Sequence, residues 1–281
     1  MHIDIREAIM QKMPRYGRRI PGFVYSRLAK IIRQRELNCI LNENAEKTGV
    51  EFAKGVLHSL DIKLNVSGME NIPEGGRYIF ASNHPLGGLD GISLIALLGE
   101  KYNGHVKFVV NDVLMAVRPL RNVFLPVNKY GSQSRQAIRQ VDEAFAGDDQ
   151  MLVFPAGLCS RMDSAGKVCD LEWQKSFITK SEETHRDVIP VYFSGLNSRF
   201  FYKFARFRKR LGLKFNIELI LLPGEMVKSR GCTFNVRIGE PIPYTAFDKS
   251  RSSREWAQTV KAAVYRLAAS NRIQQETHHH D

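Results

Sequence analysis

The sequence predicts an α/β fold in which helices flank a mostly parallel central sheet. Short apolar runs, typical of buried strands, recur along the chain after residue 61. Segments with apolar residues at helical spacing separate most of these runs, and such alternation is typical of parallel sheets with crossover helices. The chain has 281 residues, which is enough for one large domain of this class.

The N-terminal region, residues 1–60, is expected to be a basic amphipathic helical segment that precedes an α/β domain of residues 61–281. Its apolar residues recur at helical spacing, and basic residues occupy many positions between them. The apolar residues are Val24, Leu28, Ile31, Ile32, Leu37, Ile40 and Leu41, and the basic ones are Arg15, Arg18, Arg19, Arg27, Lys30, Arg33 and Arg35. Such a segment either lies on an anionic membrane or packs its apolar face on the core.

In the α/β domain, expected strands are short apolar runs bounded by turn residues, and expected helices show helical periodicity. The strands are expected at 62–68, 78–81, 106–110, 124–127, 150–154, 187–193, 215–222 and 233–238. The helices are expected at 92–98, 112–117, 134–145, 177–183 and 254–270.

The composition limits the compartment and the partners. The net charge of +12 predicts an anionic partner. No apolar run reaches the roughly 20 residues of a membrane-spanning helix, and the N-terminus lacks the pattern of a signal peptide. We therefore expect a cytoplasmic protein. The cysteines lack metal-ligand spacing, so we expect reduced thiols and no metal site.

A basic segment at residues 199–214 contains seven Lys or Arg residues, five aromatic residues and no acidic residue. Three interpretations remain open for it. It is a surface for anionic lipid headgroups, a surface for nucleic acid, or a solvated helix with its aromatic side chains in the core. No recognised nucleic-acid-binding motif accompanies the charge, so we expect no nucleic acid partner.

The segment Tyr78–Gly91 carries the clearest chemical signal. Its first residues are typical of a buried strand, and Pro85 then interrupts the hydrogen-bond ladder because it has no N–H to donate. Gly87 and Gly88 permit a sharp turn before the next helix. The segment therefore predicts a tight loop at the carboxyl end of a strand, where open α/β sheets place their chemistry.

This loop holds His84 and Asp90, six positions apart. A carboxylate that orients an imidazole makes it a better general base. The alternative is a buried turn histidine followed by a helix-capping aspartate. The pair by itself does not decide between the two interpretations, and the rest of the chain favours the catalytic one.

Four blocks occur in a fixed order along the chain. They are Asn83-His-Pro-Leu-Gly-Gly-Leu-Asp90, Phe124-Leu-Pro-Val-Asn-Lys129, Val153-Phe-Pro-Ala-Gly-Leu-Cys-Ser-Arg161 and Val188-Ile-Pro-Val191. Together, over roughly residues 60–245, they resemble the PlsC-type glycerolipid acyltransferases.

The resemblance implies that His84 takes a proton from an acceptor hydroxyl and that Asp90 orients His84. The hydroxyl oxygen would then attack a fatty acyl thioester directly. Backbone amides at Gly157 or at Gly87 and Gly88 are candidates for stabilising the charge on the thioester oxygen. The residues expected to bind substrate are Asn83, Lys129, Phe154, Pro155, Gly157, Ser160 and Arg161.

The chain departs from the family pattern at informative positions. The spacing from His84 to Asp90 is one residue longer than usual, Ala156 stands in place of a glutamate, and Lys129 stands in place of an arginine. The pattern is more similar to the haemolysin-like branch, which resembles the O-acyltransferases of ornithine and glycine lipids. Their acceptors carry a carboxylate headgroup, which Arg161 or Lys129 can hold.

The resulting hypothesis is an O-acyltransferase that needs no cofactor and acylates a lyso-aminoacyl lipid or a lysophospholipid. The donor is an acyl carrier protein or coenzyme A thioester, and the basic surface favours acyl carrier protein as a partner. We expect the enzyme to be peripheral, in contact with anionic lipids at the inner face of the cytoplasmic membrane. The alternative is a non-catalytic lipid-binding protein with the same fold, which Ala156 and the longer His84–Asp90 spacing support.

Overall fold

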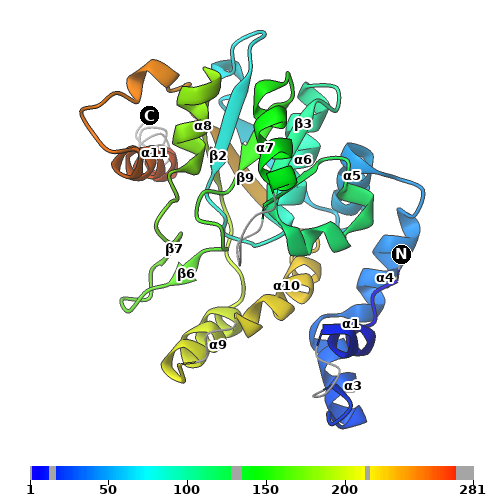
Figure 1. The fold of residues 1–281 in the computed structure, drawn as a ribbon. Helices are drawn as coiled ribbons and strands as arrows, with labels where there is room; N and C mark the ends of the chain where they lie inside the picture. The colour runs from blue at the N-terminus through cyan, green and yellow to red at the C-terminus, as the bar shows by residue number, and fades with distance from the viewer. Residues whose placement is uncertain (1, 13–16, 128–134, 213–215, 270–281) are drawn as a thin grey trace, which may run out of the picture.

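The computed structural model describes residues 2–12, 17–127, 135–212 and 216–269 (Figure 1). Lys129 lies outside these segments. The strands are β1 Lys63–Ser67, β2 Tyr78–Ser82, β3 Val106–Asn111, β4 Phe124–Val127, β5 Gln150–Val153, β6 Arg161–Met162, β7 Val168–Cys169, β8 Asp187–Phe193 and β9 Thr233–Ile238. The α-helices are α1 Ile5–Lys12, α3 Gly22–Ile31, α4 Gln34–Glu43, α5 Gly49–Ser59, α6 Leu89–Lys101, α7 Arg135–Ala146, α8 Ser176–Thr184, α9 Arg199–Arg210, α10 Leu222–Lys228 and α11 Ser253–Leu267.

The central sheet has seven strands in the order β1-β9-β8-β2-β5-β3-β4. Its neighbouring strands are parallel except for β8 and β9, which pair antiparallel. The expectation of a mostly parallel sheet flanked by helices is therefore confirmed. All five residues of the central strand β2 are buried, whereas β1 alternates between exposed and half-buried residues as an edge strand does.

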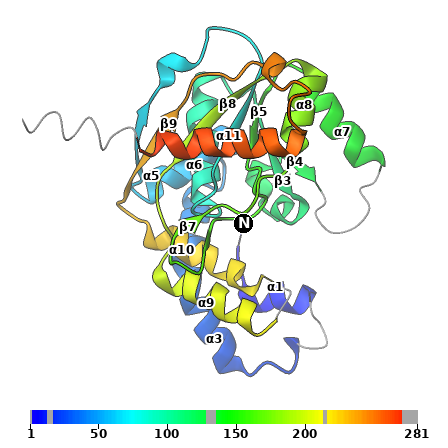
Figure 2. The same ribbon diagram turned by 90° about the vertical axis from the view of Figure 1, so that its left-hand side faces the viewer.

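Helices cover both faces of the sheet. α5 and α6 pack against each other on one side, and α11 runs across the other side, where it contacts β8 (Figures 1 and 2). α11 begins at a capping box in which the Ser252 side chain accepts from the Glu255 amide and the Glu255 side chain accepts from the Ser252 amide. Helices thus cover both faces of the sheet, so candidate catalytic residues are expected in the loops at its edges.

The N-terminal region forms several helices, and they differ in how they are packed. α4 and α5 contribute Leu37, Ile40 and Phe52 to the same core as the sheet. In α3, by contrast, only Tyr25 is buried, and Phe23 is 71% exposed. One of the two expectations for this region was packing on the core, and α4 and α5 confirm it. The outer surface of α3 is not covered by the core.

One expected strand is wrong. Residues 217–221 form a 3-10 helix, and Leu222 then begins α10, with Pro223 in its first turn. The aliphatic run is typical of a strand, but Glu218 within it is fully buried against Arg161 and Arg208. Tertiary contacts of this kind can override the local preference for a strand. The helix expected at 112–117 is a 3-10 helix, Asp112–Ala116.

Three adjacent parallel strands, β8, β2 and β5, end at the same edge of the sheet. The loop that carries His84 follows β2, and the loop that carries Phe154 follows β5. Among the described segments, no helix combines the length and the hydrophobicity that crossing a bilayer requires.

Candidate active site

His84 and Asp90 are in direct contact in the loop after β2. The distance from Nδ1 of His84 to Oδ2 of Asp90 is 2.9 Å. The His84 side chain is 16% exposed, and that of Asp90 is fully buried. An ionised carboxylate only accepts hydrogen bonds, so Nδ1 donates to Asp90, and in the neutral imidazole Nε2 is then the nitrogen that holds the lone pair. This is the arrangement that a general base requires.

Asp90 is held as a carboxylate by the loop itself. The amides of Leu86, Gly87, Gly88 and Gly91 all donate to its two oxygens, at 2.9–3.3 Å. Burial alone raises the pKa of the Asp90 carboxyl. Attraction to the His84 imidazole and these hydrogen bonds outweigh burial, so the pKa lies below its ordinary value.

The additional residue between His84 and Asp90 is accommodated by glycine. Gly87 has a positive φ of 75°, which a residue with a side chain rarely adopts. A Cβ at this position would also lie 2.8 Å from the Leu222 side chain and 3.0 Å from Cβ of Cys159. The longer spacing therefore does not separate the two side chains.

Phe154 forms one wall of the site. Its ring stacks on the His84 imidazole, with centroids 4.0 Å apart and an interplanar angle of 17°. Phe108 makes a T-shaped contact with Phe154, at a centroid distance of 5.1 Å. The imidazole is thus fixed by a hydrogen bond at one edge and by an aromatic ring on one face.

Asn83 is engaged with the neighbouring strand. Its side chain donates to the carbonyl of Phe193 and accepts from the amide of Phe193, at 2.8 and 2.7 Å. It therefore joins the ends of β2 and β8, and substrate binding by Asn83 stays a prediction. Asn197, which no sequence motif identified, donates to the carbonyls of Pro85 and Leu86 in the loop of His84.

Asp170 is a second carboxylate behind the loop that sequence reasoning missed. It is 3% exposed and accepts from the backbone amide of His84 at 3.2 Å, from Oγ of Ser160 at 2.6 Å and from Nε1 of Trp173 at 2.9 Å. The amide of Ser160 donates in turn to the carbonyl of His84 at 2.7 Å. Asp170 and Ser160 therefore join the loops that follow β2 and β5.

Arg161 is paired within the protein. Its guanidinium lies 3.0 Å from Glu218, and Glu218 lies 2.8 Å from Nε of Arg208 in α9. The Arg161 guanidinium also donates to Cys159 and stands over the Phe201 ring. Burial raises the pKa of the Cys159 thiol to about 11, and Arg161 offsets only part of this effect. Cys159 is therefore a neutral thiol at physiological pH.

The amides that the sequence suggested for stabilising an oxyanion already have acceptors. The amides of Gly87 and Gly88 donate to Asp90, and the amide of Gly157 donates to the carbonyl of Phe154 at 2.9 Å. At Gly87 and Gly88 the donors thus keep Asp90 ionised. At Gly157 the bond closes the turn after β5.

Pro155 and Ala156 complete this turn. The carbonyl of Pro155 accepts from the amide of Gln174 at 2.9 Å. Ala156 is 5% exposed and packs in an apolar cluster with Trp173 and Phe177. A glutamate at position 156 would place a charge in this cluster, so the alanine fits the local packing. Trp173 itself lies in the core.

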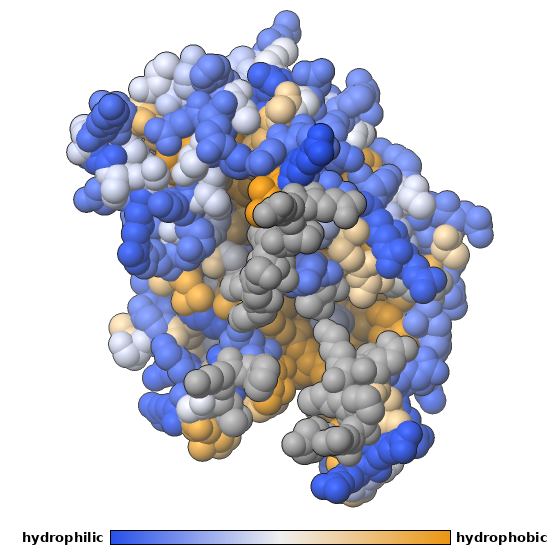
Figure 3. Space-filling view, in the orientation of Figure 1, coloured by the Kyte–Doolittle hydropathy of each residue, from blue (hydrophilic) through white to orange (hydrophobic). Residues whose placement is uncertain are grey.

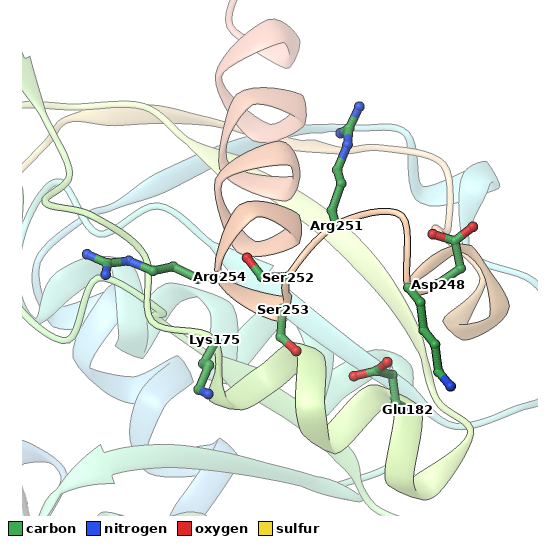
Figure 4. A pocket seen from close by; sticks show the side chains of 8 residues that line it. Lys175, Glu182, Asp248, Arg251, Ser252, Ser253 and Arg254 are labelled. Carbon is green, nitrogen blue, oxygen red and sulfur yellow. The ribbon is translucent and has the colours of Figure 1, made fainter.

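A shallow charged pocket lies elsewhere, at the start of α11, and contains none of these residues. It is lined by Lys175, Glu182, Asp248, Lys249, Arg251, Ser252, Ser253 and Arg254 (Figure 4). Its side chains include ordinary surface pairs, such as Arg254 with Glu172. In the part of the chain that the structure describes, no group of three His, Cys, Asp or Glu side chains is placed to hold a metal ion.

Comparison with known proteins identifies the family. Two relatives are each 48% identical over 265 residues, which is 94% of this chain. They are the lyso-glycine lipid O-acyltransferases of Phocaeicola vulgatus and Bacteroides thetaiotaomicron, of which 95% and 97% are covered. The crystal structure of the 1-acyl-sn-glycerophosphate acyltransferase PlsC from Thermotoga maritima is also similar, with 21% identity, 78% of each chain covered and a TM-score of 0.49.

A family model described as acyltransferase matches residues 7–273, which is nearly the whole chain. This match extends from the N-terminal helices through the His84 loop to the closing helix α11. The chain therefore belongs to the acyltransferase family and is an acyltransferase.

Proposed function

We propose that this acyltransferase moves a fatty acyl group from a thioester to the hydroxyl of a lyso-aminoacyl lipid with a glycine headgroup. The observation that carries the chemistry is the 2.9 Å contact between His84 and the ionised Asp90. The names of the two relatives at 48% identity support the acceptor class. Family membership favours transfer over the non-catalytic alternative.

In the proposed reaction, Nε2 of His84 removes the proton from the acceptor hydroxyl as its oxygen attacks the thioester carbonyl carbon. An ester C–O bond forms and the C–S bond breaks. The departing thiolate then receives the proton from the His84 imidazolium. Asp90 stabilises this transient cation and keeps the imidazole in one orientation. Protons and electrons balance over these steps.

The acceptor headgroup fits the charge beside the site. Arg161 and Arg208 supply two positive charges around the single carboxylate of Glu218. The Arg161 side chain is 15% exposed, and its planar guanidinium is suited to pairing with one headgroup carboxylate. Arg161 is connected to the catalytic loop because its neighbour Ser160 is bonded to His84.

The acyl carrier and the place of action are part of the same proposal. The basic surface favours an acyl carrier protein thioester over coenzyme A, because the carrier protein is acidic. Because the proposed acceptor and product are lipids, the proposal includes a peripheral enzyme that acts at the inner face of the cytoplasmic membrane.

The test offers acyl carrier protein loaded with labelled acyl chain to two acceptors side by side, an N-(3-hydroxyacyl) glycine and lysophosphatidic acid. We expect label in the glycine lipid with wild type and none with His84→Ala. Transfer to lysophosphatidic acid alone would refute the acceptor assignment. Full activity of His84→Ala would refute the mechanism.

A further inference from the structure

We infer that α9 is the surface by which the enzyme docks on an anionic lipid bilayer. This inference rests on the proposed function, because a lipid acceptor must reach His84 from a membrane. The helix carries six basic residues and no acidic one, and they are Arg199, Lys203, Arg206, Arg208, Lys209 and Arg210. Its positive charge therefore favours binding to an anionic surface.

An apolar stripe runs along the outer surface of this helix. Phe200, Phe204, Phe207 and Leu211 follow one another at spacings of four, three and four residues, so they share one side of the helix. Phe200 is 56% exposed, and Phe207 and Leu211 are each 58% exposed. The rings of Phe200 and Phe204 are stacked, with centroids 6.0 Å apart. On an ideal helix, Arg199, Lys203, Arg206 and Arg210 lie along one edge of this stripe.

The opposite side of α9 fixes the helix to the enzyme. Phe201, Tyr202 and Ala205 are buried there. Ser198 caps the helix and is held by Glu225 of α10, with bonds of 2.6 and 2.9 Å. The aromatic residues of this segment are therefore divided between the two sides of the helix. Those on the inner side anchor it, Phe204 is half-buried between the two sides, and Phe200 and Phe207 present their rings to solvent.

The position of α9 connects this surface to the catalytic loop. Asn197, one residue before the cap, donates to the carbonyls of Pro85 and Leu86, and Arg208 pairs with Glu218 beside Arg161. Both ribbon views place α9 at the same end of the molecule as α3 (Figures 1 and 2). Hydrophobic surface is concentrated at this end, in a hollow between α9 and α3 (Figure 3).

A bilayer fits these features better than an acidic protein does. An acyl carrier protein would satisfy the basic row, but the stripe of exposed aromatic side chains would gain little from it. The interface of an anionic membrane takes up both, with the rings among the headgroups and acyl chains and the cations against lipid phosphates. Docking by α9 would bring the loop of His84, to which Asn197 is bonded, close to the membrane surface.

The experiment measures binding of the full chain to vesicles by co-sedimentation. One set of vesicles contains phosphatidylcholine alone, and the other contains phosphatidylcholine with phosphatidylglycerol. We expect wild type to prefer the anionic vesicles and Phe200→Ser/Phe207→Ser to bind them at least about tenfold more weakly. Lys203→Gln/Arg210→Gln should bind about fivefold more weakly per charge removed, with a smaller salt dependence.

Leu171→Ser is the matched control, because Leu171 is an exposed leucine, at 42%, that lies beside α11. It should bind vesicles as wild type does, and unchanged thermal unfolding would show that every variant is folded. The inference is overturned if the double phenylalanine variant sediments like wild type. It is equally overturned if that variant keeps vesicle binding and loses binding to acyl carrier protein. Vesicle binding needs no turnover, so the result stands even if the proposed acceptor is wrong.

Discussion

Two His–Asp pairs in the described part of the molecule share a similar geometry and differ in their surroundings. His84 and Asp90 are 2.9 Å apart, and His105 and Asp149 are 3.2 Å apart. The His84 side chain is 16% exposed, whereas that of His105 is 73% exposed. Asp90 is fully buried and receives four backbone amides, but the Asp149 side chain faces Lys107 at the surface. Burial and backbone donors, and not the pairing itself, distinguish His84 as the candidate general base.

The largest difference between the pairs is expected on removal of the imidazole. His84→Ala should lower acyl transfer by about 1000-fold or more, because the acceptor hydroxyl loses its general base. His105→Ala should leave the rate unchanged. Release of the carrier thiol, followed spectroscopically, measures both. Similar losses in the two variants would remove the distinction between the pairs.

The next effect concerns the carboxylates. Asp90→Asn should lower kcat by about 100-fold, because an amide neither fixes the Nδ1–H form of His84 nor stabilises the imidazolium. Asp149→Asn is the matched control and should keep wild-type kcat. A change in KM alone, with kcat preserved, would contradict the orienting role of Asp90.

A buried and an exposed carboxylate can also be compared in their pairs with arginine. The quantity measured for these pairs is the free energy of unfolding. Glu218→Gln should lower the free energy of unfolding by about 3 kcal/mol, because it leaves Arg161 and Arg208 close together without their shared carboxylate. Glu172→Gln breaks the exposed pair with Arg254 and should change little. Urea unfolding of both variants tests this. Equal changes in the free energy of unfolding would show that burial does not strengthen the pairs of Glu218.

Asp170 sharpens the comparison because it acts on His84 through the backbone. Asp170→Asn should lower kcat by about tenfold and leave KM for the thioester near its wild-type value, since the loop shifts and the binding surface does not. Ser160→Ala, which removes one of its partners, should cause a smaller loss. An Asp170→Asn variant with wild-type kcat would show that the contact is only structural.

The smallest effect is the pH dependence of stability. The pKa of Asp90 is depressed in the folded state, so its charged form stabilises the fold above the ordinary aspartate pKa of about 3.9. This contribution is lost as the pH falls through the folded-state pKa. The stability difference between wild type and Asp90→Asn should therefore shrink in acid. A stability difference between the two proteins that stays constant from pH 7 to pH 3 would contradict the depressed pKa of Asp90.

Much of the fold and part of the site follow from local sequence patterns. The loop of His84 could be predicted because all the donors to Asp90 lie within seven residues of one another. Asp170 could not, because it lies 86 positions from His84 and belongs to no motif. The strand expected at 215–222 failed for a similar reason, since the partners of Glu218 come from β6 and α9.

The sequence by itself determined the alternation of strands and helices, the tight loop after β2 and the basic, aromatic character of residues 199–210. These features depend on periodicity, on proline and glycine and on local composition, all of which act within a few residues. Only the tertiary structure decided that Arg161 is paired with Glu218 and which aromatic side chains of α9 face outward. Those outcomes depend on burial and on contacts between distant segments, which no local pattern encodes.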